Sequence, residues 1–482
     1  MKKTNVVFIL ADDMGYWAIG KNNKEIITPN LDKLCNNGLY FDNFYCASPV
    51  CSPARASILT GLIPSCHGVH DWIRSGNIDK NDLPDEYKNL PIFSDEKNCI
   101  DYTGGYSTYI DLFKNSGYVT ALSGKWHLGD SIKCGKFDFH SNIARGGCSY
   151  YNSDYIKNGK VYFDNRYITD VITDDAINFI NNNNEKPFYL SVHYTAPHSP
   201  WDKNEHPQNI WQLYNDTTFD SIPNEKVHKD QILTAPVGFD EKSRKENLQG
   251  YFTAITAMDN CIGKIIDCLE KNNLYDNTLI MFTSDNGMNM GHHGIWGKGN
   301  GTYPQNLYET SVKVPFIAYH KDFQNGITIK DCCSHYDIYP TFKEMLKNQD
   351  MPTTKYMCGK SFFKKLYKDK NISLDSDVYI ISEYGKVRML REKKYKLILN
   401  SVNNENFLFD LENDIDEINN LYYNNKLANT IKRLTKKLNH YFDKYSNLQY
   451  TGLKQDVYGI GQLESLDSES KKFKDNIKFY YN

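Results

Sequence analysis

The sequence lacks a long apolar run, a basic tract and a paired cysteine framework. No segment approaches the roughly 18 uninterrupted apolar residues of a membrane-spanning helix, so we expect no membrane partner. The 56 Lys and Arg residues against 59 Asp and Glu residues give a formal net charge of -3, and no Lys/Arg cluster offers the positive surface that nucleic acid requires. None of the 12 cysteines forms a C-x-x-C pair, which favours reduced thiols in a cytosolic protein over zinc ribbons or a disulfide scaffold.

The first residues imitate a signal peptide. MKKTNVVFILA carries two lysines and an apolar stretch, but that stretch is only about six residues long, against roughly 7–15 in a secretory signal. It continues directly into Asp12 and Asp13. We therefore interpret it as a buried first strand and expect a cytoplasmic location.

Short apolar, β-branched segments alternate with helical segments up to about residue 345. The expected strands are 5–10, 118–124, 187–194, 277–284 and 314–320. The segments between them with apolar spacing of three and four are 28–38, 108–117, 167–182 and 248–273. This alternation predicts an α/β fold with a large, mostly parallel or mixed sheet and helices on both faces.

The pattern changes after about residue 376. DVYIISEYG, KVRMLREKKYKLILN and NFLFDL are closely spaced strand candidates, and the helical LANTIKRLTKKLNHYFDKY follows them. We expect a smaller C-terminal α+β subdomain with an antiparallel sheet and a closing helix. The predicted domains are residues 1–375 and 376–482, and the polar segment 446–482 has no assigned role.

Charged and metal-ligand residues follow four of the five expected strands. In an open α/β sheet such residues gather at one edge, where ligands bind. The residues are Asp12 and Asp13, Lys125 and His127, His193 and His198, and Asp285 and Asn286. Three carboxylates and an amide suit a hard cation, Ca²⁺ or Mg²⁺. Each acidic pair alone would also fit a strand-ending turn, but the basic residues expected at the same edge favour a metal site.

The stretch CASPVCSPARASILTG, residues 46–61, predicts a loop followed by a helix that stops at Gly61. Cys51 then lies at the helix N-terminus, where an anion is favoured, and Arg55 shares its face one turn later. A buried structural cysteine would not explain the arginine. A thiolate would suit thioester or disulfide chemistry, whereas a hard cation nearby suits an oxygen nucleophile, which an unmodified cysteine cannot supply.

CSPARASILTG resembles the signature of the type I sulfatases of the alkaline phosphatase superfamily, in which the cysteine of C-x-P-x-R becomes formylglycine. The similarity covers most of the chain and rests on further blocks in the family's order: VVFILADDMGY, ITPNLDKL, SGKWHLG, HYTAPHSPW, TSDNGMNMGHHGIWGKG and VPFI. It implies an alkaline-phosphatase-like fold. Two departures are Asp414-Ile415, where the family usually has Asp-Pro, and the long stretch NGTYPQNLYETSVKVP after Lys298.

The resemblance also implies roles for individual residues. The Ca²⁺ or Mg²⁺ ligands would be Asp12, Asp13, Asp285, Asn286 and modified Cys51. Arg55, Lys125 and Lys298 would neutralise charge on the sulfuryl group. The formylglycine hydrate would attack sulfur, His198 would protonate the leaving group, and His127 would take a proton to expel sulfate from the sulfated enzyme.

The walls of the pocket are less well defined by the sequence. Asp71, Trp72 and Arg74, in HGVHDWIRSG, are candidates to contact the leaving group. His292 and His293 follow the DNG motif closely, and His293 is a further candidate. We expect His193 to support the site rather than react, and Trp201 to line a substrate rim or pack internally.

We therefore expect a sulfuric ester hydrolase that acts on a sulfated carbohydrate or another small sulfate monoester. The alternative is a phosphonate monoester or phosphodiester hydrolase of the same superfamily, and a non-catalytic binding protein is a third reading. The expected partner is a formylglycine-generating enzyme or an anaerobic sulfatase-maturating enzyme.

Overall fold

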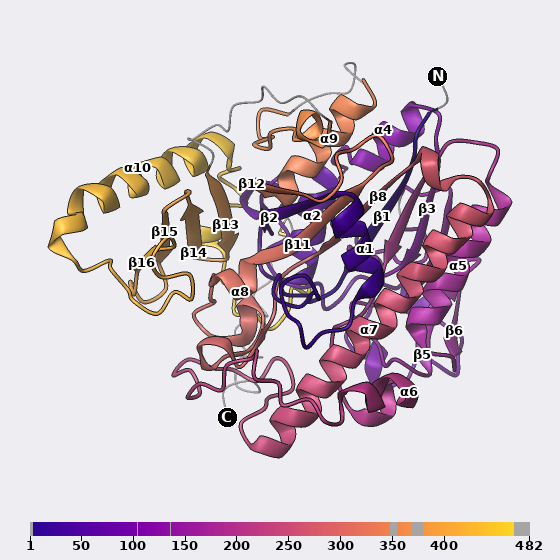
Figure 1. Ribbon diagram of the computed structural model, residues 1–482, viewed down its shortest axis with the longest axis horizontal. Helices are drawn as coiled ribbons and strands as arrows, with labels where there is room; N and C mark the ends of the chain where they lie inside the picture. Colours follow the sequence, from indigo (N-terminus) through magenta and orange to yellow (C-terminus); the bar gives the residue numbers. More distant parts are fainter. Residues whose placement is uncertain (1–2, 104, 135, 348–353, 368–378, 467–482) are drawn as a thin grey trace.

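The computed structural model describes residues 3–103, 105–134, 136–347, 354–367 and 379–466. A mixed sheet in the order β12-β2-β11-β8-β1-β7-β3-β4-β5-β6 forms its centre. Helices cover both faces of this sheet, and a second, smaller sheet lies to one side of it (Figure 1). The predicted α/β class with a smaller C-terminal antiparallel sheet is confirmed.

The strands of the large sheet are β1 (Asn5–Ala11), β2 (Leu39–Tyr45), β3 (Val119–Gly124), β4 (Phe139–Ile143), β5 (Ser153–Lys157), β6 (Lys160–Asp164), β7 (Phe188–His193), β8 (Thr278–Ser284), β11 (Lys313–Tyr319) and β12 (Ile327–Ser334). The neighbours β8, β1, β7, β3 and β4 run parallel to one another. β11 runs antiparallel to both β8 and β2, as β5 does to β4 and β6.

The first strand shows why this sheet is buried on both faces. All seven residues of β1 are buried. Val7 and Ile9 join the core on one face, whereas Val6, Phe8 and Leu10 join the core on the other. This follows from the period of two in a strand, and a near-continuous apolar run is what a parallel strand between two helical layers requires.

The α-helices are α1 (Pro29–Asn37), α2 (Cys51–Thr60), α3 (Pro64–His67), α4 (Tyr109–Asn115), α5 (Ile168–Asn182), α6 (Gln208–Trp211), α7 (Glu241–Lys271), α8 (Glu309–Val312), α9 (Ile338–Met345) and α10 (Ala428–Tyr445). Helices α1, α5 and α7 pack on the face of Val7 and Ile9. Helices α2, α4 and α9 pack on the opposite face. Among the residues that the structure describes, no helix is both long and apolar enough to span a bilayer.

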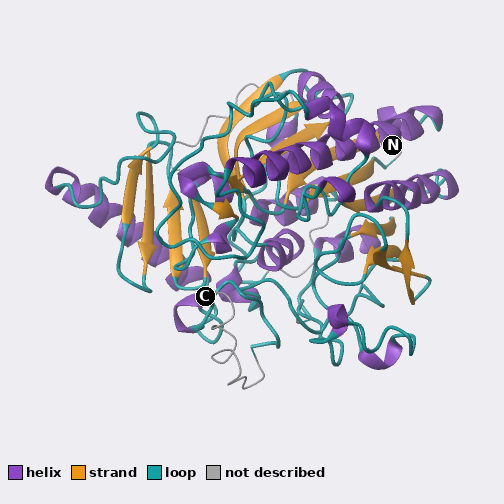
Figure 2. Cartoon of the chain, turned by 90° about the horizontal axis from the view of Figure 1, so that it is seen from below, coloured by secondary structure: helices purple, strands orange, loops and turns teal. Residues whose placement is uncertain are grey.

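The smaller sheet is an antiparallel meander of β13 (Ile380–Tyr384), β14 (Val387–Arg391), β15 (Tyr395–Asn400) and β16 (Phe407–Asp410). Helix α10 packs on one face through Leu434 and Leu438, and Figure 2 shows this sheet beside the main body. A two-stranded ribbon of β9 (Asn289–Met290) and β10 (Trp296–Gly297) follows β8. The predicted domain boundary between residues 375 and 376 lies outside the described residues and stays a prediction.

Several elements differ from the sequence-based expectation. The strands β2, β4, β5, β6 and β12 were not predicted, because polar residues interrupt their apolar patterns. Helix α7 begins at Glu241, seven residues before the expected start at 248, because Asp240 caps it by accepting a hydrogen bond from the Ser243 amide.

Residues 447–464, which we call the C-terminal strap, return from α10 to the main body. Gln462 forms a parallel bridge with Ile73. The Gln462 amide donates to the Trp72 carbonyl at 2.7 Å, and the Arg74 amide donates to the Gln462 carbonyl at 2.9 Å. The sequence alone left this segment without a role, and the structure pairs it with the loop that follows α3.

Candidate active site

The four central parallel strands end at the same level of the sheet. Leu10 of β1 pairs with His193 of β7 and with Thr283 of β8, and Gly124 of β3 also pairs with His193. The residues that follow these ends therefore meet at one edge, as predicted. β11 carries no such residue there because it runs in the opposite direction.

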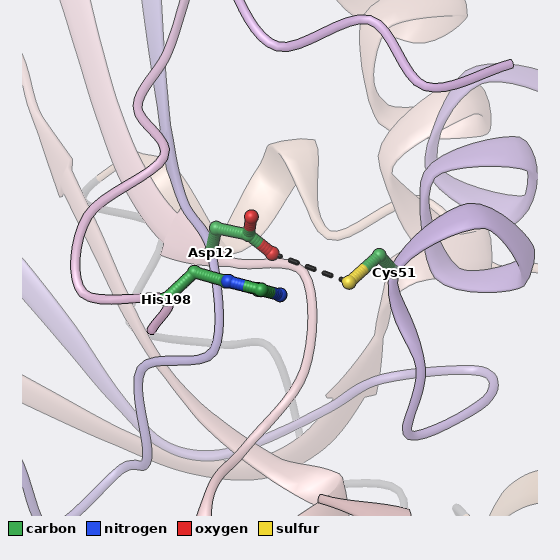
Figure 3. Close-up of side chains that lie close together, drawn as sticks. All are labelled: Asp12, Cys51 and His198. Atoms are coloured by element: carbon green, nitrogen blue, oxygen red, sulfur yellow. Dashed lines mark hydrogen bonds between the residues drawn. The ribbon is translucent and has the colours of Figure 1, made fainter. Parts of the chain in front are cut away.

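Helix α2 brings Cys51 to this edge. Cys51 is its first residue and is 2% exposed, and all ten residues of the helix are buried. Pro53 lies in the first turn, and Gly61 ends the helix in the left-handed region at φ 69°, which glycine adopts without strain. In Figure 3 the Cys51 sulfur points toward the Asp12 carboxylate, with His198 beside them. The predicted position of Cys51 is confirmed.

Buried lysines and carboxylates surround the Cys51 sulfur. Lys125 Nζ lies 2.5 Å from Asp12 Oδ2. Lys298 Nζ lies 2.6 Å from Asp13 Oδ1 and 2.8 Å from Cys51 Sγ. Cys51 Sγ lies 3.3 Å from Asp12 Oδ1. Residues from β1, β3, α2 and the ribbon after β8 thus form one polar cluster.

The Arg55 guanidinium is held by Asp285 rather than by position 51. Arg55 Nε lies 2.8 Å from Asp285 Oδ2, and Nη1 donates to the Lys125 carbonyl at 3.0 Å. Arg55 Nη2 is buried and has no hydrogen-bond partner among the described residues. A buried N–H group without a hydrogen-bond acceptor costs folding free energy. An anionic ligand in the site could supply the acceptor that this nitrogen lacks.

The donor set fits a hard divalent cation. Oxygen atoms of Asp12, Asp13 and Asp285 and the Cys51 sulfur all lie within 4.8 Å of one another. Asn286 donates through Nδ2 to Asp13 Oδ1 at 2.8 Å. Its Oδ1 is buried without a partner in the described part of the chain. Three carboxylates and an orphaned amide oxygen are the ligands that Ca²⁺ or Mg²⁺ prefers.

Burial and charge set the protonation of the cluster. Burial raises the pKa of Asp12, but Lys125 and His198 outweigh it, so that the pKa lies below its usual value. Burial, followed by the Asp12 charge, raises the pKa of Asp285. Burial and the Asp12 carboxylate also raise the pKa of the Cys51 thiol. The unmodified thiol is therefore protonated at neutral pH and is a poor nucleophile.

His127 has one nitrogen fixed by the backbone and one free. Its Nε2 lies 2.8 Å from the Ile73 carbonyl, and since a carbonyl only accepts, Nε2 carries the proton. Its Nδ1 is buried with no partner among the described residues. Burial, followed by the Lys125 charge, lowers the pKa of His127 well below its usual value. The ring is neutral, and Nδ1 can accept a proton.

His198 has the opposite arrangement. Its Nδ1 lies 2.7 Å from the Ser199 carbonyl and so carries a proton. Its Nε2 lies 3.7 Å from Asp13 Oδ2. The side chain is 27% exposed and lines the cavity in front of Cys51. A proton on Nε2 would therefore face both the cluster and the entrance.

A cavity of about 500 Å³ leads to Cys51, His127, His198 and Lys298. Trp72 and Arg74, two of the weaker candidates, line it. Asp71 does not, because its carboxylate accepts hydrogen bonds from the Tyr384 hydroxyl at 2.6 Å and the Gly461 amide at 3.1 Å. Its expected contact with the leaving group is therefore not supported by this geometry.

Four other aromatic or histidine candidates lie away from the cavity. His293 stacks on Tyr308 at 3.9 Å, and His292 packs on Trp17 at 4.8 Å. His193 Nδ1 donates to the Lys125 carbonyl at 3.1 Å. Trp201 is buried and donates to the Pro197 carbonyl at 2.8 Å.

Sequence reasoning missed several segments of the cavity wall, among them Arg145-Gly146-Gly147, which follows β4. Two consecutive glycines after an arginine were the available signal. A Cβ on Gly146 would lie 2.0 Å from His127 Nε2, and a Cβ on Gly147 would lie 3.5 Å from His198 Cε1. The backbone therefore passes directly against both histidines.

Comparison with known proteins identifies the family. A sequence model of the Sulfatase family matches residues 4–347. A second model, N-sulphoglucosamine sulphohydrolase, C-terminal, matches residues 291–444. An N-acetylglucosamine-6-O-sulfatase of Bacteroides thetaiotaomicron is 28% identical over 71% of this chain and 67% of its own length. An arylsulfatase of Clostridium perfringens is 26% identical over 90% of this chain and 93% of its own length.

Solved structures show the same fold. A structure described as a complex with its substrate D-glucosamine-2-N,6-O-disulfate has a TM-score of 0.74 at 23% identity and covers 92% of this chain and 98% of its own. A phosphonate monoester hydrolase of Silicibacter pomeroyi has a TM-score of 0.70 at 17% identity, covering 92% and 96%. The fold is thus shared with an enzyme named for a different kind of ester, a phosphonate monoester. The Sulfatase model matches most of this chain, and the chain belongs to the sulfatase family.

Proposed function

We propose that this sulfuric ester hydrolase cleaves a sulfate monoester of a small carbohydrate through formylglycine at position 51. One observation carries the proposal: Cys51 begins a buried helix at the point where three cations and three carboxylates converge. Such a cluster favours a tetrahedral anion beside a metal ion. The family match places it in a chain with the sulfatase signature.

Asp12, Asp13, Asp285 and Asn286 would hold a Ca²⁺ or Mg²⁺ ion. The ion would polarise a sulfate oxygen and neutralise charge that develops in the transition state. The partnerless Asn286 Oδ1 and the mutual proximity of the carboxylates support this assignment.

Cys51 would be converted to formylglycine by a formylglycine-generating or anaerobic sulfatase-maturating enzyme. The hydrated aldehyde supplies the oxygen nucleophile that a protonated thiol does not. Lys298, 2.8 Å from the present sulfur atom, would stabilise negative charge at this position.

Three cations of the chain would bind and orient the sulfuryl group. Arg55 offers the free Nη2, and Lys125 and Lys298 lie on either side of the aspartate pair. Because their geometry is fixed by Asp285, Asp12 and Asp13, they need no rearrangement as charge develops. This preorganisation is the main electrostatic source of catalysis that the site offers.

The two histidines would move protons. His198 would donate from Nε2 to the leaving alcohol in its doubly protonated form, since Nδ1 keeps its own proton on the Ser199 carbonyl. His127 would accept a proton at Nδ1, since its Nε2 is bound to Ile73. An acid and a base on different elements allow both halves of a double displacement.

The carbohydrate assignment rests on the cavity and on relatives. A volume of about 500 Å³ lies within the range of small-molecule sites. A relative acts on N-acetylglucosamine 6-O-sulfate by its name. The polar side chains in the wall, which include Asn77, Ser94 and Asn300, suit hydroxyl groups.

The test combines peptide mass spectrometry across residue 51 with assays of sulfate release from sulfated sugars and an aryl sulfate. We expect a mass lower than that of cysteine by about 18 Da, the difference between a thiol and an aldehyde after modification, together with released sulfate. Cys51→Ala should abolish turnover and keep the fold. Cys46→Ala, at another buried cysteine, is the matched control.

Two outcomes would overturn the proposal. Active protein with an unmodified Cys51 would return that residue to thiolate chemistry. Modified protein that releases no sulfate but hydrolyses a phosphonate monoester or phosphodiester would establish the alternative reaction.

A further inference from the structure

Arg145 lines the cavity in front of Cys51, together with His127 and His198. The two glycines after it place the backbone against His127 and His198, the residues that would handle the leaving-group proton and the later hydrolysis. Arg145 is not part of the acidic cluster around Cys51, and in the proposed reaction it would face the sugar.

Arg145 forms an ion pair with Asp154, which lies outside the cavity lining. Arg145 Nε lies 3.0 Å from Asp154 Oδ2, and Nη2 lies 3.3 Å from Asp154 Oδ1. The Asp154 side chain is 3% exposed and is not among the residues lining the cavity, whereas that of Arg145 is 23% exposed. A two-point contact on one edge of the guanidinium orients its remaining donors.

Arg74, the other arginine that lines the cavity, has a partner that also lines it. Arg74 Nε lies 2.7 Å from Asp95 Oδ2, and both Arg74 and Asp95 line the cavity. That pair therefore presents both charges to a ligand and suits hydroxyl groups. Arg145 presents only its positive charge, because its partner lies behind it.

We propose that Arg145 forms a subsite for a second anionic group, a sulfate or a carboxylate, on the sugar that leaves. The inference rests on the proposed sulfatase function and specifies its substrate: a sulfated sugar that carries another acidic substituent. The guanidinium edge not used by Asp154 binds that substituent. The Arg145–Asp154 pair keeps the guanidinium in place before the substrate arrives.

The test compares three substrates that share one scissile sulfate: a neutral sugar sulfate, the same sugar with a second sulfate, and a uronate with the same sulfate. The variants are Arg145→Gln and the double variant Arg145→Gln/Asp154→Asn, which leaves no buried carboxylate without a partner. Arg166→Gln is the matched control, since Arg166 is exposed and pairs with Asp164 of β6 and Asp174 of α5. The readout is the ratio of kcat/KM for each acidic substrate to that for the neutral one.

We expect the natural protein to prefer one of the acidic substrates by about 10-fold or more, the effect of a charge-assisted hydrogen bond. Both Arg145 variants should bring the ratio close to one, and Arg166→Gln should leave it unchanged. The substrate whose ratio falls identifies sulfate or carboxylate as the second group. If Arg145 only attached its loop to β5, the Arg145→Gln variant would have a lower kcat/KM for all three substrates by the same factor. That result would overturn the proposal.

A binding measurement separates this subsite from the reaction. Calorimetry with the Cys51→Ala protein and the disulfated and uronate sugars needs no turnover. In one outcome, the natural protein releases no sulfate while Arg145→Gln still weakens binding of an acidic sugar about 10-fold. That result would contradict the proposed reaction and support the proposed subsite. Equal binding of neutral and acidic sugars would refute the subsite.

Discussion

At the scale of single residues, a backbone carbonyl determines which ring nitrogen of each of the two histidines carries a proton. Ile73 holds the proton of His127 on Nε2, and Ser199 holds that of His198 on Nδ1. Each ring consequently presents a different nitrogen to the cavity. A backbone carbonyl thus holds one proton of each ring before substrate binds, and a second proton on His198, needed for an acid, would lie on Nε2 beside the Asp13 carboxylate.

His198→Ala tests the acid role through the leaving group. We expect turnover of a sugar sulfate to fall by about 10²–10⁴-fold, the range for loss of a general acid. An aryl sulfate with an acidic phenol should lose much less, because its phenolate departs without a proton. Steady-state assays of both substrates measure this, with the exposed His440→Ala as control. Equal losses for the two substrates would contradict the role.

Asn286→Ala tests the metal site. Ca²⁺ or Mg²⁺ should raise the melting temperature of the natural protein, and chelation should reverse the rise. At a concentration of 100 times Kd, the stabilisation of the folded state is about 2.7 kcal/mol. Removing Oδ1 should reduce it at a given ion concentration, whereas Asn142→Ala, at a buried asparagine in β4, should not. No effect of either ion on the natural protein would count against the site.

Residues at strand ends could be predicted from the sequence, and Arg145 could not. Asp12, Lys125 and Asp285 follow strong apolar strands whose carboxyl ends must converge. Arg145 follows β4, of which only two residues are buried, so the apolar pattern does not mark where that strand ends and the two glycines after Arg145 are the only local signal. It lines the same cavity as His198, which is 53 positions away along the chain.

At the scale of elements, the C-terminal strap supports one wall of the cavity. The Gln462 side chain accepts from the His70 amide at 3.0 Å and donates to the Gly68 carbonyl at 3.3 Å. The Gly459 carbonyl accepts from Trp72 Nε1 at 3.2 Å and from Asn300 Nδ2 at 3.0 Å. Gly459, Trp72 and Asn300 all line the cavity.

Gln462→Ala should loosen this wall. It leaves the buried His70 amide without its acceptor, which costs about 1–3 kcal/mol. We expect faster hydrogen exchange at the amides of 68–74 and a higher KM for sugar sulfates. Gln455→Ala, in the same segment and with only a 3.3 Å contact to the Gln449 carbonyl, should change neither. Unchanged exchange in Gln462→Ala would show that the backbone pairing alone holds the loop.

The sequence pattern predicts elements whose burial is regular and misses those at edges. β12 is an edge strand with five of its eight residues at least partly exposed, so its apolar signal is weak. The direction of β11 was also beyond the sequence, because a strand buried on both faces reads alike in either orientation. Pairing of the strap with residues 72–74 depends on contacts across more than 380 positions.

At the scale of the whole molecule, buried charges join the two sheets. Lys396 of β15 is fully buried and lies 3.0 Å from Glu309 Oε1 of α8 and 2.7 Å from Glu417 Oε1. Tyr45 of β2 donates to Glu309 Oε2 at 2.8 Å. Removing one member would leave a buried charge unpaired, so this set fixes how the small sheet sits on the large one.

The raised pKa of Asp71 predicts how the free energy of unfolding depends on pH. Its carboxyl contacts Tyr384 of the small sheet and Gly461 of the strap, and burial raises its pKa to about 6. Between about pH 4 and 6 the folded protein keeps a proton that the unfolded chain has lost, so stability falls as pH rises through this window, by up to about 1.4 kcal/mol per pH unit.

Urea unfolding at pH 4, 5 and 7 measures this dependence. Asp71→Asn should flatten it, so the natural protein should lose its advantage over the variant as pH rises. The exposed Asp216→Asn serves as control. Parallel curves for natural protein and Asp71→Asn would exclude Asp71 as the source.

The burial of α2 limits the time during which Cys51 is accessible while the protein is being synthesised. Helix α9, which packs on α2, is synthesised long after Cys51 has left the ribosome, and Tyr339 of α9 closes over Gly61. At roughly 5–20 residues per second, the intervening stretch of about 290 residues takes about 15 to 60 s to produce. If Cys51 is converted as we propose, a maturating enzyme would have that interval to reach it on the nascent chain. Faster translation would shorten the interval and leave a larger fraction of molecules folded but permanently unconverted.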